Sequence, residues 1–435
     1  MKKLNWIFAT STLLLAGCSS DEPATQPEDA DKPGVEEPMK PGESEENKWE
    51  TVNVISLSQA EKPVMESMND FGYKLMLEYA KASKDGSFDV SPVSVSTYLS
   101  MMANATAGDI HDQILAALGA TDMDALNSLN SKLMHYLPCE ENGACLEINN
   151  RIWLSNKYTA PVALTKTVKE VYNADVESVD FTLPTTVPAI NKWVSDKTHG
   201  LIPKLLYREW INYIEMNHAS ANTVYFKGEW AGKFDKNATT NSLFTAPTGK
   251  TQVDMMHKVV ETYYAKVDGT QIVKLSYRGG ANSIELYLPT EGTAVKDIAL
   301  SLNPDLQTKL AANLSIYEVT LSLPRFKSNS EQIPLNDALQ NMGITSLLET
   351  DFSPLGINEI SPLQVMHQTS ISVNEEGTEL AAVTGGFDAL APFPSEDEIE
   401  TPKVKVDFDR PFMYMVRNRV TGAILMAGVV TNPKK

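Results

Sequence analysis

The stretch Ser372–Thr384 reads Ser-Val-Asn-Glu-Glu-Gly-Thr-Glu-Leu-Ala-Ala-Val-Thr, and its character changes halfway along. Ile371–Val373 alternates β-branched and polar side chains, as strands do. Gly377 then gives the backbone a pivot that can take conformations closed to other residues. The small and β-branched residues from Thr378 to Thr384 suit a strand that passes between two existing strands. This segment can exist as a loop or as a sheet strand, although Glu-Glu-Gly-Thr taken alone favours a solvated turn before an ordinary strand.

Other motifs along the chain decide between these interpretations. They are Asp89–Ser94; Ile190–Val194 followed by Thr198, Gly200 and Ile202; Asn222–Trp230 followed by Phe234; and Phe408–Phe412 with Gly428–Pro433. In this order, and together with the segment at 372–384, the motifs resemble the serpins, a family of single-use inhibitors of serine and cysteine proteases. The resemblance runs from about Thr51 to the end of the chain.

The N-terminus carries a targeting pattern. Met1–Gly17 contains two lysines, an apolar run and small residues before Cys18, as a secretory signal does. Leu15-Ala-Gly-Cys18 resembles a bacterial lipobox, in which the cysteine becomes the lipidated N-terminus of the mature protein. The apolar run is too short to span a hydrocarbon core of about 30 Å. We therefore expect a signal peptide over residues 1–17 and a membrane anchor at Cys18, which makes the chain an outer membrane lipoprotein on the cell surface or the periplasmic face.

Composition divides the remainder into two parts. Residues 18–50 are acidic and rich in proline, with few large apolar side chains, so they are expected to form a disordered tether. From Thr51 onward the composition is that of a globular protein, without a linker or an internal repeat, so 51–435 is predicted to be one serpin domain. The formal charge of −19 gives no electrostatic reason to bind nucleic acid. We expect the chain to act as a monomer.

Hydrophobic periodicity predicts an α+β fold. Helical spacing connects Met65, Met68, Phe71, Leu75 and Tyr79, and also Ile110, Ile114 and Leu118. Strand-like runs follow at 152–154, 223–226, 284–288, 319–323 and 424–430. Helices early and strands late favour α+β over alternating βαβ units. The family resemblance implies, more specifically, three β-sheets, about eight or nine helices and an exposed reactive-centre loop.

No pattern points to an enzyme. The six histidines are scattered singly, and no zinc-protease, nucleophile-elbow or phosphate-loop motif occurs. Cys139 and Cys145 flank a turn-like insert and can close a small disulfide in an oxidising compartment, but no nearby histidine completes a metal site. We therefore expect no catalytic residue, no metal and no cofactor. An unrelated surface lipoprotein enzyme or glycan-binding module remains an alternative for which the chain offers no motif.

The resemblance assigns mechanical roles to three groups of residues. The hinge of the reactive loop is Glu375, Glu376, Gly377, Thr378, Glu379, Leu380, Ala381 and Ala382. The shutter, a polar cluster beneath the place where the central sheet parts, is Ser91, Ser94, Asn222 and His367. The breach, at the top of that sheet, is Trp230, Arg325 and Glu375.

The resemblance also implies a mechanism. A target protease attacks one bond of the exposed segment near 378–402 and forms its acyl-enzyme, and the hinge then inserts as a new central strand. We expect cleavage between Leu390 and Ala391, with Phe387 and Ala389 as alternatives. Because no Lys or Arg lies between residues 377 and 402, elastase-like or subtilisin-like serine proteases are favoured over trypsin, and cysteine proteases are a second class.

Two residues keep an alternative open. Leu380 departs from the alanine usual in serpins, and Asp388 would face inward on the inserted strand, where an unpaired carboxylate is costly. These departures favour a non-inhibitory serpin-fold protein that is cleaved as a substrate without trapping the protease.

Overall fold

The computed structural model describes residues 56–84, 86–136, 144–207, 209, 216–294, 297, 299–300, 304–329, 333–378 and 401–434. The predicted signal peptide, the tether and Cys18 lie outside these residues. So do Cys139, the hinge residues Glu379–Ala382 and the bait residues Phe387–Ala391.

Eight α-helices lie in the described part of the chain: α1 (Glu61–Ala82), α2 (Pro92–Ala105), α3 (Asp109–Ala117), α4 (Met123–Tyr136), α5 (Val162–Tyr172), α6 (Thr186–Lys197), α9 (Pro304–Ala312) and α10 (Asn336–Asn341). The apolar residues at helical spacing in α1 and α3 are buried, which confirms those two predictions. At the start of α2, Ser91 accepts a hydrogen bond from the Ser94 N–H and Pro92 occupies the first turn. Nearly every residue of α2 is buried, so this helix runs through the core.

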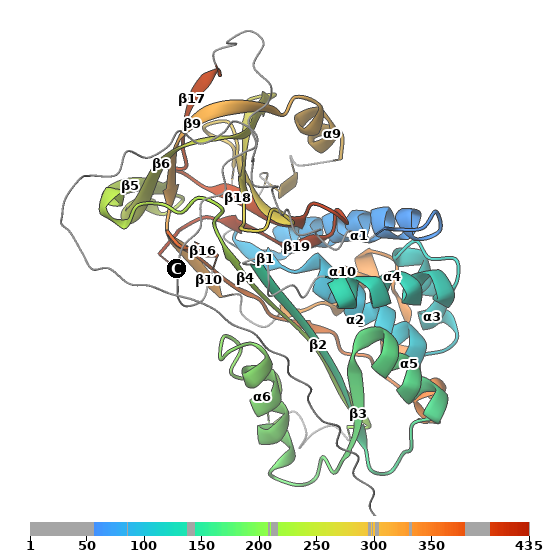
Figure 1. The fold of residues 1–435 in the computed structure, drawn as a ribbon. Helices are drawn as coiled ribbons and strands as arrows, with labels where there is room; N and C mark the ends of the chain where they lie inside the picture. The colour runs from blue at the N-terminus through green and yellow to red at the C-terminus, as the bar shows by residue number, and fades with distance from the viewer. Residues whose placement is uncertain are drawn as a thin grey trace, which may run out of the picture. The chain divides into compact units, whose positions relative to one another are not determined.

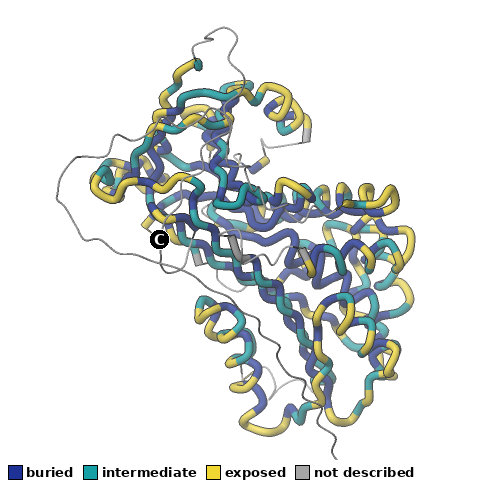
Figure 2. The backbone as a smooth tube through the Cα atoms, in the orientation of Figure 1, coloured by how far each residue is buried: buried dark blue, intermediate teal, exposed yellow. Residues whose placement is uncertain are grey.

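The largest sheet has nine strands in the order β1 (Phe88–Val90), β19 (Ile424–Val430), β18 (Phe412–Asn418), β8 (Asn282–Leu288), β7 (Thr270–Ser276), β6 (Gly249–Val267), β9 (Ser315–Pro324) and β17 (Lys403–Asp407), with β5 (Thr240–Ala246) also paired to β6. The long strand β6 pairs with β5 and β9 over its first part, but its last residues, Tyr264–Val267, pair with β7. The nine-stranded sheet therefore consists of two sheets that share β6. Strands β18 and β19 are buried along most of their length (Figure 2).

The third sheet has six strands in the order β10 (Phe326–Asn329), β15 (Ser370–Val373), β16 (Gly377–Thr378), β4 (His218–Glu229), β2 (Ala144–Ser155) and β3 (Ala174–Val179). Two small ladders join β11 (Ile333–Pro334) to β14 (Met366–His367) and β12 (Thr350–Asp351) to β13 (Ile360–Ser361). Three sheets and eight helices in the described residues confirm the predicted α+β class. The predicted strand runs also fall within β2, β4, β8, β9 and β19.

Helices cover both faces of the six-stranded sheet. In Figure 1, α6 lies on the opposite side of β2 and β4 from α2 and α5. Alternation along the strands explains this, because Ile152 and Leu154 of β2 join the main core, whereas Trp153 packs in a second apolar cluster with Ile190 and Val194 of α6. No helix in the described ranges is long and apolar enough to cross a membrane.

Candidate functional site

The six-stranded sheet is open between β15 and β4. Within the described residues these two strands are connected only through β16, which is two residues long. Thr378 pairs antiparallel with Val373 of β15 on one side and with Gly228 of β4 on the other. Below Thr378, the described part of the chain places no strand between β4 and β15.

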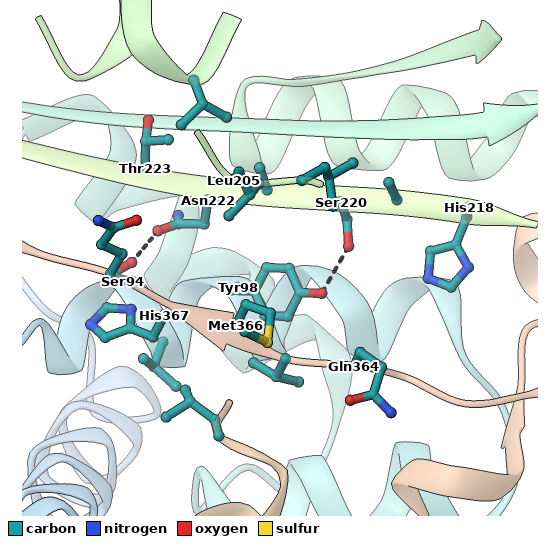
Figure 3. Close-up of a pocket in the computed structure, with 18 of the residues that line it drawn as sticks. Ser94, Tyr98, Leu205, His218, Ser220, Asn222, Thr223, Gln364, Met366 and His367 are labelled. Carbon is teal, nitrogen blue, oxygen red and sulfur yellow. Dashed lines mark hydrogen bonds between the residues drawn. The ribbon is translucent and has the colours of Figure 1, made fainter. Parts of the chain in front are cut away.

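A cavity of about 420 Å³ occupies the lower part of this opening. One wall is β4 from His218 to Thr223, and the facing wall is the segment from Ser361 to Gln368 (Figure 3). Ser94 and Tyr98 of α2 line it from one face of the sheet, whereas Val194 of α6 and Ile202 line it from the other. Since both faces contribute, the cavity passes through the plane of the sheet.

Three buried polar atoms in the cavity lining are unsatisfied. Thr223 Oγ1, Ser361 Oγ and Gln368 Oε1 have no hydrogen-bond partner among the described residues. Buried polar groups are nearly always paired in folded proteins, so an unpaired set along one slot marks a place where another group belongs. A strand inserted between β4 and β15 would supply such partners.

The predicted shutter residues lie together at this cavity. The backbone N–H of Ser91 donates to His367 Nε2 at 3.1 Å, and the Ser94 N–H donates to Ser91 Oγ at 3.3 Å. The Ser94 hydroxyl donates to Asn222 Oδ1, as Figure 3 shows. His367 belongs to one side of the opening and Asn222 to the other, so the start of α2 bridges the two sides.

His367 is held in its neutral form. Burial lowers its pKa to about 4. Because Nε2 accepts the Ser91 N–H, the neutral ring carries its proton on Nδ1. His367 therefore acts in a hydrogen-bond network.

The predicted breach residues also come together. Arg325 Nε donates to both carboxylate oxygens of Glu375 at 2.8 Å, and the Thr239 hydroxyl donates to the same carboxylate. Glu375 is 2 % exposed. Burial opposes its ionisation, but the hydrogen bonds from Arg325 and Thr239 outweigh burial and hold the pKa of Glu375 below its usual value. Trp230 Nε1 donates to the backbone carbonyl of Asn374 at 2.8 Å.

Sequence reasoning missed several partners of the hinge. Glu376 lies 2.7 Å from both Lys233 Nζ and Lys236 Nζ, and these contacts lower its pKa to about 2. The Thr378 hydroxyl lies 2.6 Å from the Tyr277 phenol oxygen. Lys233 lies within the segment from Trp230 to Phe234 and Lys236 follows it closely, which was an available signal. Nothing near Tyr277 in sequence indicates its role.

Two expectations about the hinge are corrected. Gly377 does not use the left-handed backbone region. A Cβ on it would lie 2.0 Å from the Gly228 carbonyl oxygen, so glycine is required here because the hinge approaches β4 closely. The prediction that the exposed segment starts near Thr378 is also wrong at that residue, which is 3 % exposed within β16.

These features define an α+β domain with a hinge strand at the head of an open slot in its six-stranded sheet. The family model described as "Serpin (serine protease inhibitor)" matches residues 66–433, and the chain belongs to this family. Most serpins are protease inhibitors, and some members are not.

Individual relatives support this assignment. The chain is 28 % identical to the human leukocyte elastase inhibitor over 378 residues, covering 83 % of this chain and 97 % of that protein. It is 30 % identical to Iripin-1 of Ixodes ricinus over 379 residues, covering 84 % and 93 %. Among solved structures, a complex of thyroxine-binding globulin with thyroxine is similar, with a TM-score of 0.73, 25 % identity and coverage of 85 % of this chain and 99 % of that one.

Proposed function

We propose that this chain is an inhibitory serpin that traps serine proteases in a single-use reaction. The observation that carries the proposal is the opening between β15 and β4, because its top is already occupied by the start of the bait segment. A sheet with a missing strand and a hinge seated at the head of the gap is suited to take up the rest of that segment.

The reaction begins as ordinary proteolysis. The protease serine attacks the carbonyl carbon of Leu390, the bond from Leu390 to Ala391 breaks, and an ester joins the protease to Leu390 while Ala391 becomes a free amino terminus. The hinge then continues β16 downward. About 14 residues at ~3.3 Å each would carry the attached protease roughly 45 Å before water can release it. The intact form is therefore held by a kinetic barrier, although the inserted form is more stable.

We expect the inserted strand to continue the register that β16 already has. Continuing the pairing of Thr378 with Gly228 and Val373 sets Thr384 opposite Asn222 and His367, within the shutter. Residues at even positions would share the face of Thr378, toward α2. The inserted backbone would fill the cavity and pair with both of its walls.

The bait composition supports elastase-like or subtilisin-like targets, with cysteine proteases as a second class. Phe387, Ala389, Leu390 and Ala391 are apolar and small to medium in size, and Pro392 disfavours cleavage after Ala391. The acidic run 396–400 would speed encounter with a basic protease. The similarity to a protein named leukocyte elastase inhibitor points the same way.

The second candidate is a serpin-fold protein that is cleaved without trapping its protease. Leu380 and Asp388, both on the inward-facing register, favour it because they would slow insertion. Thyroxine-binding globulin, which has a similar fold, shows that the serpin fold also occurs in non-inhibitory proteins.

A panel of serine and cysteine proteases, analysed on denaturing gels, tests the proposal. A covalent adduct with an elastase-like enzyme supports inhibition, and mass spectrometry should show a C-terminal fragment that begins at Ala391. A clipped chain without adduct supports the substrate alternative. Thr378→Arg should convert trapping to simple cleavage because a long charged side chain cannot occupy the buried site beside Tyr277. Ser395→Arg, beyond the scissile bond, is the matched control and should still trap.

The proposed location is the outer membrane, through a lipid on Cys18 and the tether 18–50. Cys18→Ala should move the protein from the membrane fraction to the soluble fraction. Protease treatment of intact cells then distinguishes the cell surface from the periplasmic face.

A further inference from the structure

We propose that a second polar latch, formed by Asn127, Tyr172 and Asn104, holds the six-stranded sheet closed at a distance from the opening. Asn150 connects this latch to the shutter. The inference rests on the proposed function, because it concerns how readily the sheet admits the loop. None of these four residues belongs to the hinge, shutter or breach.

The first link lies within the sheet. Asn150 of β2 is directly opposite Asn222 of β4, and the Asn222 Nδ2 donates to Asn150 Oδ1 at 2.7 Å. The other end of the Asn222 amide accepts from the Ser94 hydroxyl. Both ends of the Asn222 side chain are thus fixed, and Asn150, which is 3 % exposed, sets its orientation.

The second link leaves the sheet. Asn150 Nδ2 donates to the backbone carbonyl of Tyr172, the last residue of α5, at 2.8 Å. The Tyr172 side chain is fully buried, and its hydroxyl donates to Asn127 Oδ1 of α4 at 2.7 Å. These two hydrogen bonds therefore connect β2 to α5 and α5 to α4.

The third link returns to α2. Asn127 and Asn104 exchange two hydrogen bonds, at 3.0 Å from Asn104 Nδ2 and at 3.1 Å from Asn127 Nδ2. Asn104 is near the end of α2, while Ser94 is near its start. Helix α2 is therefore tied to the β4–β2 side of the sheet in three ways: through Ser94 and Asn222, through Tyr98 and Ser220 at 2.8 Å, and through α4 and α5.

This arrangement gives the latch its effect. Helix α2 is also fixed to the opposite side of the opening, through Ser91 and His367. When β4 and β2 move away from β15, every bond between α2 and the moving side must break or stretch. The amide pair at Asn127 belongs to a continuous set of bonds that runs from α2 through α4 and α5 to β2, so this set and the bond at Ser94 oppose opening together.

The test compares loop incorporation with overall stability. Asn127→Leu should raise the rate at which the warmed, intact protein incorporates its own loop by about tenfold. It should also lower the number of inhibitor molecules consumed per trapped protease, because faster insertion leaves less time for hydrolysis of the ester. The control is Asn282→Leu, which removes a buried amide pair with Asn418, at 3.0 Å, in the nine-stranded sheet. At a matched loss of stability to denaturant, the control should leave the incorporation rate near that of the wild type.

A double-mutant cycle separates coupling from general weakening. If the latches act together, Ser94→Ala combined with Asn127→Leu should raise the rate by less than the product of the two single effects. Equal rates in Asn127→Leu and Asn282→Leu at matched stability, or single effects that simply multiply, would overturn the latch. A wild type that never incorporates its loop would contradict the proposed function instead. In that case, the denaturant midpoint still tests the connection between Asn127 and Asn222. If the shift in the double variant equals the sum of the shifts in Asn127→Leu and Asn222→Ala, the two residues are not connected.

Discussion

The hydroxyl oxygen of Thr378 lies 2.6 Å from the phenol oxygen of Tyr277, and this contact seats the last described hinge residue inside the sheet. Tyr277 is itself fully buried and stacks against Trp230, with ring centroids 4.9 Å apart and planes 8° from parallel. The hinge is thus bound at its entry point by a rigid aromatic pair. In the proposed mechanism, this contact sets the register at which insertion starts.

Replacing Glu375 should release the top of the sheet. Glu375→Lys removes the ion pair with Arg325 and places a cation in a buried site, at a cost of about 2 kcal/mol or more. We expect the variant to convert faster to an inactive loop-inserted form or polymer on warming, measured as loss of protease-trapping activity with time.

The exposed partner of the same arginine gives the control. Asp254 lies 3.3 Å from Arg325 Nη1 but its side chain is 56 % exposed, so Asp254→Lys should change the conversion rate little. Full activity of Glu375→Lys after prolonged warming, or equal effects of the two variants, would show that the buried pair does not restrain insertion.

Adding one methyl group to the hinge should expel it from the sheet. In Gly377→Ala, the Cβ would meet the backbone of Gly228 and Glu229, which cannot move aside as a flexible side chain does. We expect faster hydrogen exchange at Thr378 and altered fluorescence of Trp230. Gly232→Ala is the control, because its Cβ would approach only the end of Lys258. Unchanged exchange at Thr378 would contradict the steric role of Gly377.

Some of this site could be predicted from sequence and some could not. Family motifs brought Arg325, Glu375 and Trp230 to one place because each lies in a recognisable segment, and helical and alternating periodicity predicted α1, β4 and β9. Tyr277 was missed because its partner is 101 positions away and only the strand register brings them together.

The reason for Gly377 was also beyond the sequence. A glycine that turns the chain and a glycine that admits a neighbouring backbone look the same in a sequence, and only the 2.0 Å approach to the Gly228 carbonyl separates them. Asn150 was missed for a similar reason, since an asparagine within a strand pattern carries no sign of whether it faces a partner or solvent.

Asp89 should make the intact protein less stable at neutral pH than in mild acid. Burial raises its pKa to about 6, despite hydrogen bonds from Ser328 and Tyr414. Since the folded state keeps this proton to a higher pH than the unfolded chain, stability falls as pH rises from about 4 to about 6. Asp89→Asn should recover up to about 3 kcal/mol at pH 7.5 and little at pH 4. Asp112→Asn, on the exposed side of α3, should change neither value, and an equal change at both pH values would refute the assignment.

His218 should make loop insertion sensitive to pH. Burial lowers its pKa to about 4 in the intact protein, and the register of β16 would bring Asp388 opposite it after insertion. An adjacent carboxylate raises the pKa of a histidine, so insertion takes up a proton and is favoured more at low pH. The rise in melting temperature on loop cleavage should therefore be larger at pH 5 than at pH 7.5.

Two substitutions test this pairing. His218→Asn and Asp388→Asn should each remove the pH dependence of the rise, whereas His135→Asn, at an exposed position of α4, should leave it. A dependence that survives both substitutions at the opening would mean that Asp388 does not reach His218. The same pairing would remove the cost of burying Asp388, which otherwise favours the substrate alternative.

The central claim, that the opening between β15 and β4 takes up the loop, is tested most directly by the melting temperature of the protein before and after cleavage between Leu390 and Ala391. Cleavage ordinarily destabilises a fold. Here a new strand with a ladder of hydrogen bonds on both sides should raise the midpoint by tens of degrees. A midpoint that stays the same or falls would contradict the account.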